Sequence, residues 1–178
     1  MTYTDNYRAI VSTATPAQIE QAVQWYADAE LVAHEMVGIF ASRGIHADVE
    51  ICASVIAGFS PRNRWSRNVM QALNFAHGFD NYVGLKNNLR MAENAMTLGF
   101  DALKGLKTNA FARNIAGDDE AVTIDVWMMR AAGLISDSPN KTQYRELSEA
   151  CREIATELRM TPRATQALIW IIFRGSAD

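Results

Sequence analysis

Two residues with chemistry of their own, Lys107 and Asp125, stand 18 positions apart in the sequence. Asp125 lies between an apolar run and a helix-like segment in AVTIDVWMMRAAG, residues 121–133. A carboxylate at a helix start can stabilise positive charge that develops on a neighbouring atom. A deprotonated lysine can attack an electrophilic carbon. The ordinary alternatives are that Asp125 only caps a helix and that Lys107 is a solvated surface residue.

The elements that would position these two residues are helices. A helix is expected from about Lys107 to Ala116, because Gly117 ends the pattern. Asp125 stands where an N-cap belongs, ahead of a helix over 126–132 that Gly133 would end. The backbone N–H groups and the dipole at that helix start would stabilise the negative charge of the carboxylate.

Helical patterns cover the rest of the chain as well. Threonine or serine followed by proline marks three expected helix starts, at Thr15, Ser60 and Thr161. The Ser60 signal predicts a helix through about Phe75, and VEICASVIAGF, residues 49–59, is a buried helix or a strand. The chain as a whole is therefore expected to be all-α, a compact bundle of about eight to ten short helices in one domain over residues 1–178.

Basic residues are concentrated in the middle of the chain. Eight basic and three acidic residues lie between Pro61 and Arg113, which gives this stretch a net charge of +5. The remainder carries 9 basic and 17 acidic residues, and the whole chain has a net charge of −3. This distribution is typical of a surface that faces an anion such as nucleic acid. The alternative is a chance fluctuation on a solvated surface.

The cysteine and histidine content limits the cofactors. Cys52 and Cys151 lie in apolar segments and are expected to be buried free thiols of a reducing cytoplasm. Two cysteines and three scattered histidines support neither an iron–sulfur cluster nor a zinc site, so no metal and no other cofactor is expected. No membrane partner is expected either, since no apolar run approaches the roughly 18 residues of a membrane span. The first residues also lack the features of a signal peptide.

The segment LKGLKTNAFARNIAGDDEAVTID, residues 103–125, resembles the core of the helix–hairpin–helix (HhH-GPD) DNA glycosylases, whose best-known branch is endonuclease III-like. In that family a hairpin of the type LPGVGxKT precedes a helix and then a VDTHVxR-type segment, whose aspartate is the catalytic carboxylate. The residues that match these motifs are, in order, Gly105, Lys107, Thr108, Ile124, Asp125 and Arg130.

Two earlier segments are also similar to the family. SVIAGFSPRNRWSRNV, residues 54–69, resembles the LLSAQTTDxxVN segment that approaches the extruded base, and it places Ser60 at the glutamine position. GLKNNLRMAENAM, residues 84–96, is similar to the helix that follows in the family. The resemblance therefore runs from about Ser54 to Arg130, in the family's order.

The chain departs from the family's pattern in the hairpin and after the aspartate. Ala102 and Leu103 stand where the family has Pro-Gly, so the first hairpin glycine is missing. Val126 and Trp127 replace the segment with the histidine, and the iron–sulfur cysteines are absent, as they are from many members. The missing hairpin glycine means that the hairpin need not have the family's phosphate-binding geometry.

The resemblance implies a small, divergent, phage-type member of the superfamily. It implies a glycosylase-like core over about residues 51–135, with the terminal helices as a second lobe. It also implies a DNA glycosylase that cleaves the N-glycosidic bond of a flipped base. Asp125 would be catalytic, and Lys107 would be either the Schiff-base nucleophile of an AP lyase or a phosphate contact. Trp127 would line the base pocket. The residues expected to contact DNA are Ser60, Arg62, Asn63, Arg64, Arg67, Lys104, Gly105 and Thr108.

Other functions stay open. A same-fold enzyme acting on modified, including hypermodified, pyrimidines in DNA would use the same carboxylate. A non-catalytic DNA-binding module would explain the altered hairpin, and a helical interaction protein would explain the acidic total charge. The expected partner is double-stranded DNA in every reading except the last. The lack of a long heptad pattern favours a monomer.

Overall fold

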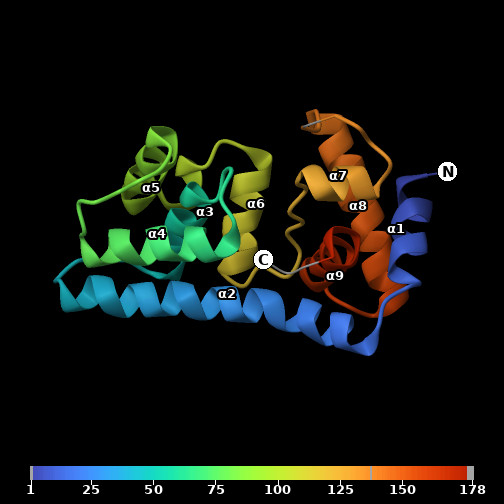
Figure 1. Ribbon diagram of the computed structural model, residues 1–178, viewed down its shortest axis with the longest axis horizontal. Helices are drawn as coiled ribbons and strands as arrows, with labels where there is room; N and C mark the ends of the chain where they lie inside the picture. The colour runs from blue at the N-terminus through green and yellow to red at the C-terminus, as the bar shows by residue number, and fades with distance from the viewer. Residues whose placement is uncertain (1, 137, 176–178) are drawn as a thin grey trace. The chain divides into compact units, whose positions relative to one another are not determined.

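The computed structural model describes residues 2–136 and 138–175, and in these residues nine α-helices and one 3-10 helix follow one another without a β-strand (Figure 1). The elements are α1 (Tyr3–Val11), α2 (Pro16–Ser42), α3 (Val49–Phe59), α4 (Trp65–His77), α5 (Lys86–Leu98), η1 (Gly99–Ala102), α6 (Leu106–Ile115), α7 (Val126–Ala131), α8 (Lys141–Leu158) and α9 (Pro162–Arg174). The expected all-α class is confirmed. One helix, α2, spans 27 residues and so is not one of the short helices expected.

The chain divides into two units. Within the described residues, unit 1 combines residues 2–27 with 118–136 and 138–175, and unit 2 is the stretch Asp28–Gly117. Helix α2 passes from one unit into the other. The glycosylase-like core expected over about residues 51–135 overlaps both units. The organisation of residues 1–178 as a single domain stays a prediction.

Unit 1 brings α1 together with α7, α8 and α9, which lie far from α1 in the sequence (Figure 1). A capping box of Asn140 and Gln143 starts α8, whose apolar stripe is fully buried at Leu147, Cys151 and Ile154. The hydroxyl of Tyr7 on α1 donates to the carbonyl of Met128 on α7 over 3.0 Å. The start of the chain is thus bonded directly to the helix that follows Asp125.

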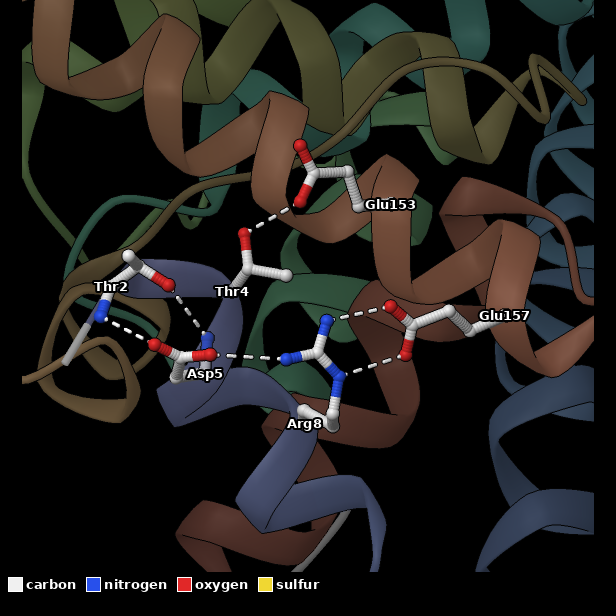
Figure 2. Close-up of polar contacts among 6 residues, drawn as sticks. All are labelled: Thr2, Thr4, Asp5, Arg8, Glu153 and Glu157. Atoms are coloured by element: carbon white, nitrogen blue, oxygen red, sulfur yellow. Dashed lines mark hydrogen bonds and ion pairs between the residues drawn. The ribbon is translucent and has the colours of Figure 1, made fainter.

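Polar side chains join the outer faces of α1 and α8 (Figure 2). The guanidinium of Arg8 donates to both carboxylate oxygens of Glu157, over 2.6 and 3.0 Å, and to Asp5 over 3.1 Å. The hydroxyl of Thr4 donates to Glu153 over 2.8 Å. Because all these groups are solvent-accessible, they fix the register of α1 on α8 and contribute less stability than the apolar stripe beneath them.

The Arg8–Glu157 pair makes the stability of unit 1 depend on pH. The hydrogen bond from Arg8 holds the pKa of Glu157 below its ordinary value of 4.5. A lowered folded-state pKa contributes stability that is present above pH 4.5 and is lost as the pH falls through the folded-state value. Glu157→Gln should therefore flatten the loss of thermal stability on acidification. Midpoints of thermal unfolding measured from neutral pH to about pH 3 would check this. Glu146→Gln, an exposed position on the same helix, should leave the wild-type slope unchanged.

Unit 2 is built around α3, whose residues from Cys52 to Phe59 are all buried. Asp48 caps the helix by accepting from the backbone N–H of Ile51 over 2.9 Å, so the segment that could have been a strand is a helix. Helices α4, α5 and α6 pack around it (Figure 1). A Cβ on Gly58 would lie 3.0 Å from the backbone nitrogen of Ala92, so the missing side chain lets α3 and α5 approach closely.

Both cysteines are buried free thiols, as expected, and burial raises the pKa of each thiol to about 12. They are therefore packed as apolar groups and not as reactive thiolates. Within the described residues, no helix combines the length and apolar character required to cross a membrane.

Candidate functional site

Asp125 caps α7, as the sequence predicts. An extended segment leads into the helix, and Asp125 has the β-region backbone typical of an N-cap. Its Oδ1 accepts from the backbone N–H groups of Trp127 and Met128, each over 2.9 Å. These two bonds use donors that the first turn of a helix cannot satisfy internally. They fix the carboxylate at the positive end of the short helix.

The second carboxylate oxygen is held by a residue 45 positions away. The indole N–H of Trp170 on α9 donates to Oδ2 of Asp125 over 3.1 Å. An ionised carboxylate offers about four acceptor positions. Donors among the described residues fill both positions of Oδ1 and one of Oδ2, which leaves Oδ2 with one lone pair. Asp125 is partly exposed, so this remaining position can be reached by a ligand or a water.

Aromatic rings and arginines lie beside the carboxylate. The guanidinium of Arg174 lies over the rings of both Trp170 and Trp127, at 4.7 and 5.9 Å from their centroids. Arg130 lies 5.1 Å from the centroid of Trp127. Trp127 is partly exposed, and its role as a wall of a base pocket stays a prediction. The two arginines thus make cation–π contacts with the two indole rings.

Three tyrosines near Asp125 stay neutral. Burial raises the pKa of Tyr7, Tyr26 and Tyr144, in the last case to about 12, and the negative charge of Asp125 raises all three further. Tyr144 donates to the carbonyl of Val122 and accepts from the N–H of Ile124, so it holds the segment before Asp125 in place. These three side chains thus place neutral aromatic groups near the carboxylate, and Tyr144 holds the segment that leads to it.

The second group of candidate residues belongs to unit 2, at the connection from α5 to α6. Asn109 on α6 donates to the carbonyls of Phe100 and Leu103, over 3.0 and 3.4 Å, and so braces η1 against α6. Gly105 is the N-cap of α6 and provides no side chain for capping. The hydroxyl of Thr108 donates to the carbonyl of Gly105 over 3.0 Å. Lys104 and Lys107 are exposed on either side of Gly105.

Leu103 occupies the position of the family's first hairpin glycine and has a packing role there. Its side chain is 3% exposed and packs with Ala57 and Ala112, against Phe100 and Phe111. The position at which the resembled family has a glycine is used here to anchor the connection in the core of unit 2. The backbone of this connection is accordingly a 3-10 turn followed by an extended residue.

The loop after α3 differs from the expectation. The helix predicted to start after Ser60 starts instead at Trp65, because residues 61–62 form a turn in which Arg62 has a φ of 61°. The side-chain amide of Asn88 holds this turn by donating to the carbonyls of Phe59 and Pro61, over 3.1 and 2.9 Å. The proline signal therefore marks a turn and not a helix start.

Two of the DNA-contact candidates in this loop are bonded to the protein itself. The hydroxyl of Ser60 donates to the carbonyl of Ala57, and the amide of Asn63 donates to Phe59 and to the buried Gln71. By contrast, Arg62 and Arg64 are exposed at the tip of the loop. All eight basic side chains between Pro61 and Arg113 are exposed in the structure.

The structure thus places Asp125 and Trp127 in unit 1, and the Ser60–Arg67 and Lys104–Thr108 groups in unit 2. Sequence reasoning missed Trp170 and Arg174 as neighbours of Asp125. Trp170 stands in an apolar run, where an indole is expected to be a core side chain. The described residues contain no cluster of histidine, cysteine, aspartate and glutamate side chains that could hold a metal ion.

In the described residues the protein is helical, with a capped, partly exposed carboxylate in one unit and eight exposed basic side chains between Pro61 and Arg113 in the other. It belongs to DUF7178, a family of unknown function whose pattern matches residues 1–177. Comparison with curated proteins and with solved structures gives no match.

Proposed function

We propose that the protein is a DNA glycosylase of the HhH-GPD type that cleaves the N-glycosidic bond of a damaged or modified base flipped out of duplex DNA. The observation that carries this proposal is the Asp125 carboxylate. Three N–H groups fix its orientation, one lone pair remains on Oδ2, and the site is partly exposed. A carboxylate used only as a cap does not need a second oxygen held by a distant indole.

Cleavage of the bond builds positive charge on the sugar. In the proposed reaction the C1′–N bond breaks and the base leaves with the bonding electron pair, while Asp125 stabilises the cationic sugar. A water held by the remaining lone pair of Oδ2 then forms the new C1′–O bond, and its proton passes to the departing base or to solvent. Because the carboxylate is oriented before substrate arrives, little reorganisation accompanies the charge development.

Lys107 provides the second activity of the proposal. If its amine loses its proton on binding DNA, it can attack C1′ in place of water and displace the base. Opening of the C1′–O4′ bond would then turn this C1′–N link into a protonated Schiff base, from which the 3′ phosphate can be eliminated, and this would make the protein an AP lyase. Otherwise, Lys107 binds a phosphate. Its exposure at the second position of α6 suits either role.

The basic residues of unit 2 would hold the DNA. In this proposal Arg62, Arg64, Arg67 and Lys104 neutralise phosphates, and the backbone at Gly105 and Thr108 approaches the strand. Ser60 and Asn63 would act through the shape of the loop, because their side chains are bonded to the protein. The protein would work without a cofactor, as a monomer in the cytoplasm.

A non-catalytic DNA-binding module is the second candidate, and the capping role of Asp125 favours it. Such a module would bind duplex DNA with a steep salt dependence and would release no base. An enzyme that modifies pyrimidines would likewise leave no abasic site, but it would change the mass of the base.

Borohydride trapping tests the lyase part of the proposal. The protein is incubated with duplex DNA that carries an abasic site, and borohydride is added to reduce any Schiff base to a stable bond. We expect a covalent protein–DNA band that Lys107→Ala abolishes, and Lys86→Ala, another exposed lysine of unit 2, should leave the band intact. A band that persists in Lys107→Ala would contradict the assignment of this lysine. No band on the abasic duplex, together with release of a base from duplexes that carry damaged or modified bases, would identify a monofunctional glycosylase.

A further inference from the structure

A pocket of about 290 Å³ opens in unit 2 between α4, the segment 79–83 and α5. Its lining is partly aromatic, from Phe75, Phe79 and Tyr82, and partly polar, from Arg67, Asn74 and Asn81. The volume is at the low end of the range for small-molecule sites, so the pocket suits one small ligand or one unit of a polymer.

The aromatic side of the pocket is packed against neighbouring rings. Phe75 and Tyr82 both pack against the fully buried ring of Phe59, with centroids 5.7 and 5.5 Å away. Phe79 stacks on His77 with an angle of 17° between the ring planes, yet it remains 57% exposed. A large aromatic side chain that is held in place and still exposed offers a stacking surface for a planar ligand.

Hydrogen bonds from α4 preform the rim of the pocket. Arg67 and Gln71 both donate to the carbonyl of Val83, over 3.0 and 2.9 Å. The hydroxyl of Tyr82 donates to the carbonyl of Leu85 over 3.0 Å. A Cβ on Gly84 would press on the Tyr82 hydroxyl and the Gln71 amide, so the absence of a side chain leaves room for both groups beside the loop. The segment is thus tied to α4 before any ligand arrives.

The polar groups of the pocket have unused hydrogen-bonding capacity. Among the described residues no hydrogen bond engages the side-chain amides of Asn74 and Asn81. An amide offers donors and acceptors side by side, as does the edge of a nucleobase. Arg67 has five N–H donors, and within the described residues one of them is used, in the hydrogen bond to the carbonyl of Val83. The others can bind a phosphate.

We propose that this pocket binds a nucleotide, with the base stacked on Phe79, its edge facing Asn74 and Asn81, and its phosphate on Arg67. The nucleotide could be a free mononucleotide or one unstacked unit of a DNA strand, because both present the same base and phosphate. The site is independent of Asp125, which belongs to the other unit. Nucleotide binding can therefore be tested whether or not the glycosylase proposal holds.

The test is calorimetric titration of the full chain with each deoxynucleoside 5′-monophosphate, with a short single-stranded oligodeoxynucleotide, and with deoxyribose 5-phosphate. We expect saturable binding of a mononucleotide or of the single strand, and none of the sugar phosphate that lacks a base. Binding of the mononucleotide would identify the free nucleotide as a sufficient ligand. Binding of the oligonucleotide alone would identify a strand.

Substitutions of pocket residues test whether the nucleotide binds in this pocket. Phe79→Ala and Asn81→Ala change exposed residues, and Phe79→Ala should weaken binding by about tenfold or more, as loss of base stacking does elsewhere. Phe173→Ala and Asn94→Ala are matched exposed controls that should bind like the wild type. Asp125→Asn should also bind like the wild type, which separates this proposal from the catalytic one. The absence of saturable binding to every probe, or unchanged binding in Phe79→Ala and Asn81→Ala, would overturn the proposal.

Discussion

Asp125→Asn should lower the rate of base release by about 100- to 1000-fold, the range seen when one preorganised electrostatic group is removed from an active site. Asparagine caps helices as well as aspartate does, so Oδ1 can still accept from Trp127 and Met128. The negative charge beside the sugar is lost. Single-turnover assays with saturating protein would measure the rate of the chemical step, and the affinity for duplex DNA should change little.

Two further variants separate catalysis from structure. Asp48→Asn changes the same kind of residue at the N-cap of α3 and should leave the rate unchanged. In Asp125→Asn the new amide faces the indole N–H of Trp170, and two donors then oppose each other. The double variant Asp125→Asn with Trp170→Phe removes this conflict. If the double variant recovers the wild-type rate, the carboxylate is not the catalytic group.

Neutralising four cations of unit 2 should greatly weaken the binding of duplex DNA. In the quadruple variant, Arg62, Arg64, Lys104 and Lys107 are changed to glutamine. Each lost phosphate contact should reduce the slope of log affinity against log salt by about 0.9 and, near 0.1 M salt, cost on the order of tenfold in affinity. The combined loss should therefore exceed about 100-fold. Fluorescence anisotropy over a series of salt concentrations would measure both quantities.

The matched control removes the same charge from unit 1. Changing Lys141, Arg145, Arg152 and Arg159 to glutamine alters the net charge equally, and all four side chains are exposed on or next to α8. The control should keep the wild-type salt slope. Equal losses in the two quadruple variants would mean that DNA responds to the total charge of the protein and not to these four cations of unit 2.

Local signals in the sequence predicted much of the fold. The cap-plus-proline signals at Thr15 and Thr161 and the glycine after α7 act within a few residues, and each produces the expected element. Asp125 at the N-cap of α7 follows from the same kind of signal. The proline after Ser60 misled because Asn88, far along the chain, holds the carbonyls of Phe59 and Pro61 in a turn.

The surroundings of the candidate site could not be predicted in the same way. The bond between Trp170 and Asp125 joins residues from different helices, and no periodicity within α9 indicates it. In the sequence, Leu103 is only a departure from the hairpin pattern, and nothing near it indicates that its side chain is buried. Its burial among Ala57, Ala112 and two phenylalanines gives it a role in the core. A local signal in the sequence thus reveals Asp125, the central residue of the site. The side chains around it are set by long-range packing, which the sequence pattern does not show.

The most direct test of the central claim is to count abasic sites in duplex DNA after incubation with the wild-type protein. The duplexes carry a panel of damaged and modified bases, each at one defined position. We predict abasic sites at one or more of these bases with the wild type and with Asp48→Asn, and few or none with Asp125→Asn. Salt-dependent binding of the same duplexes without an abasic site on any of them would contradict it.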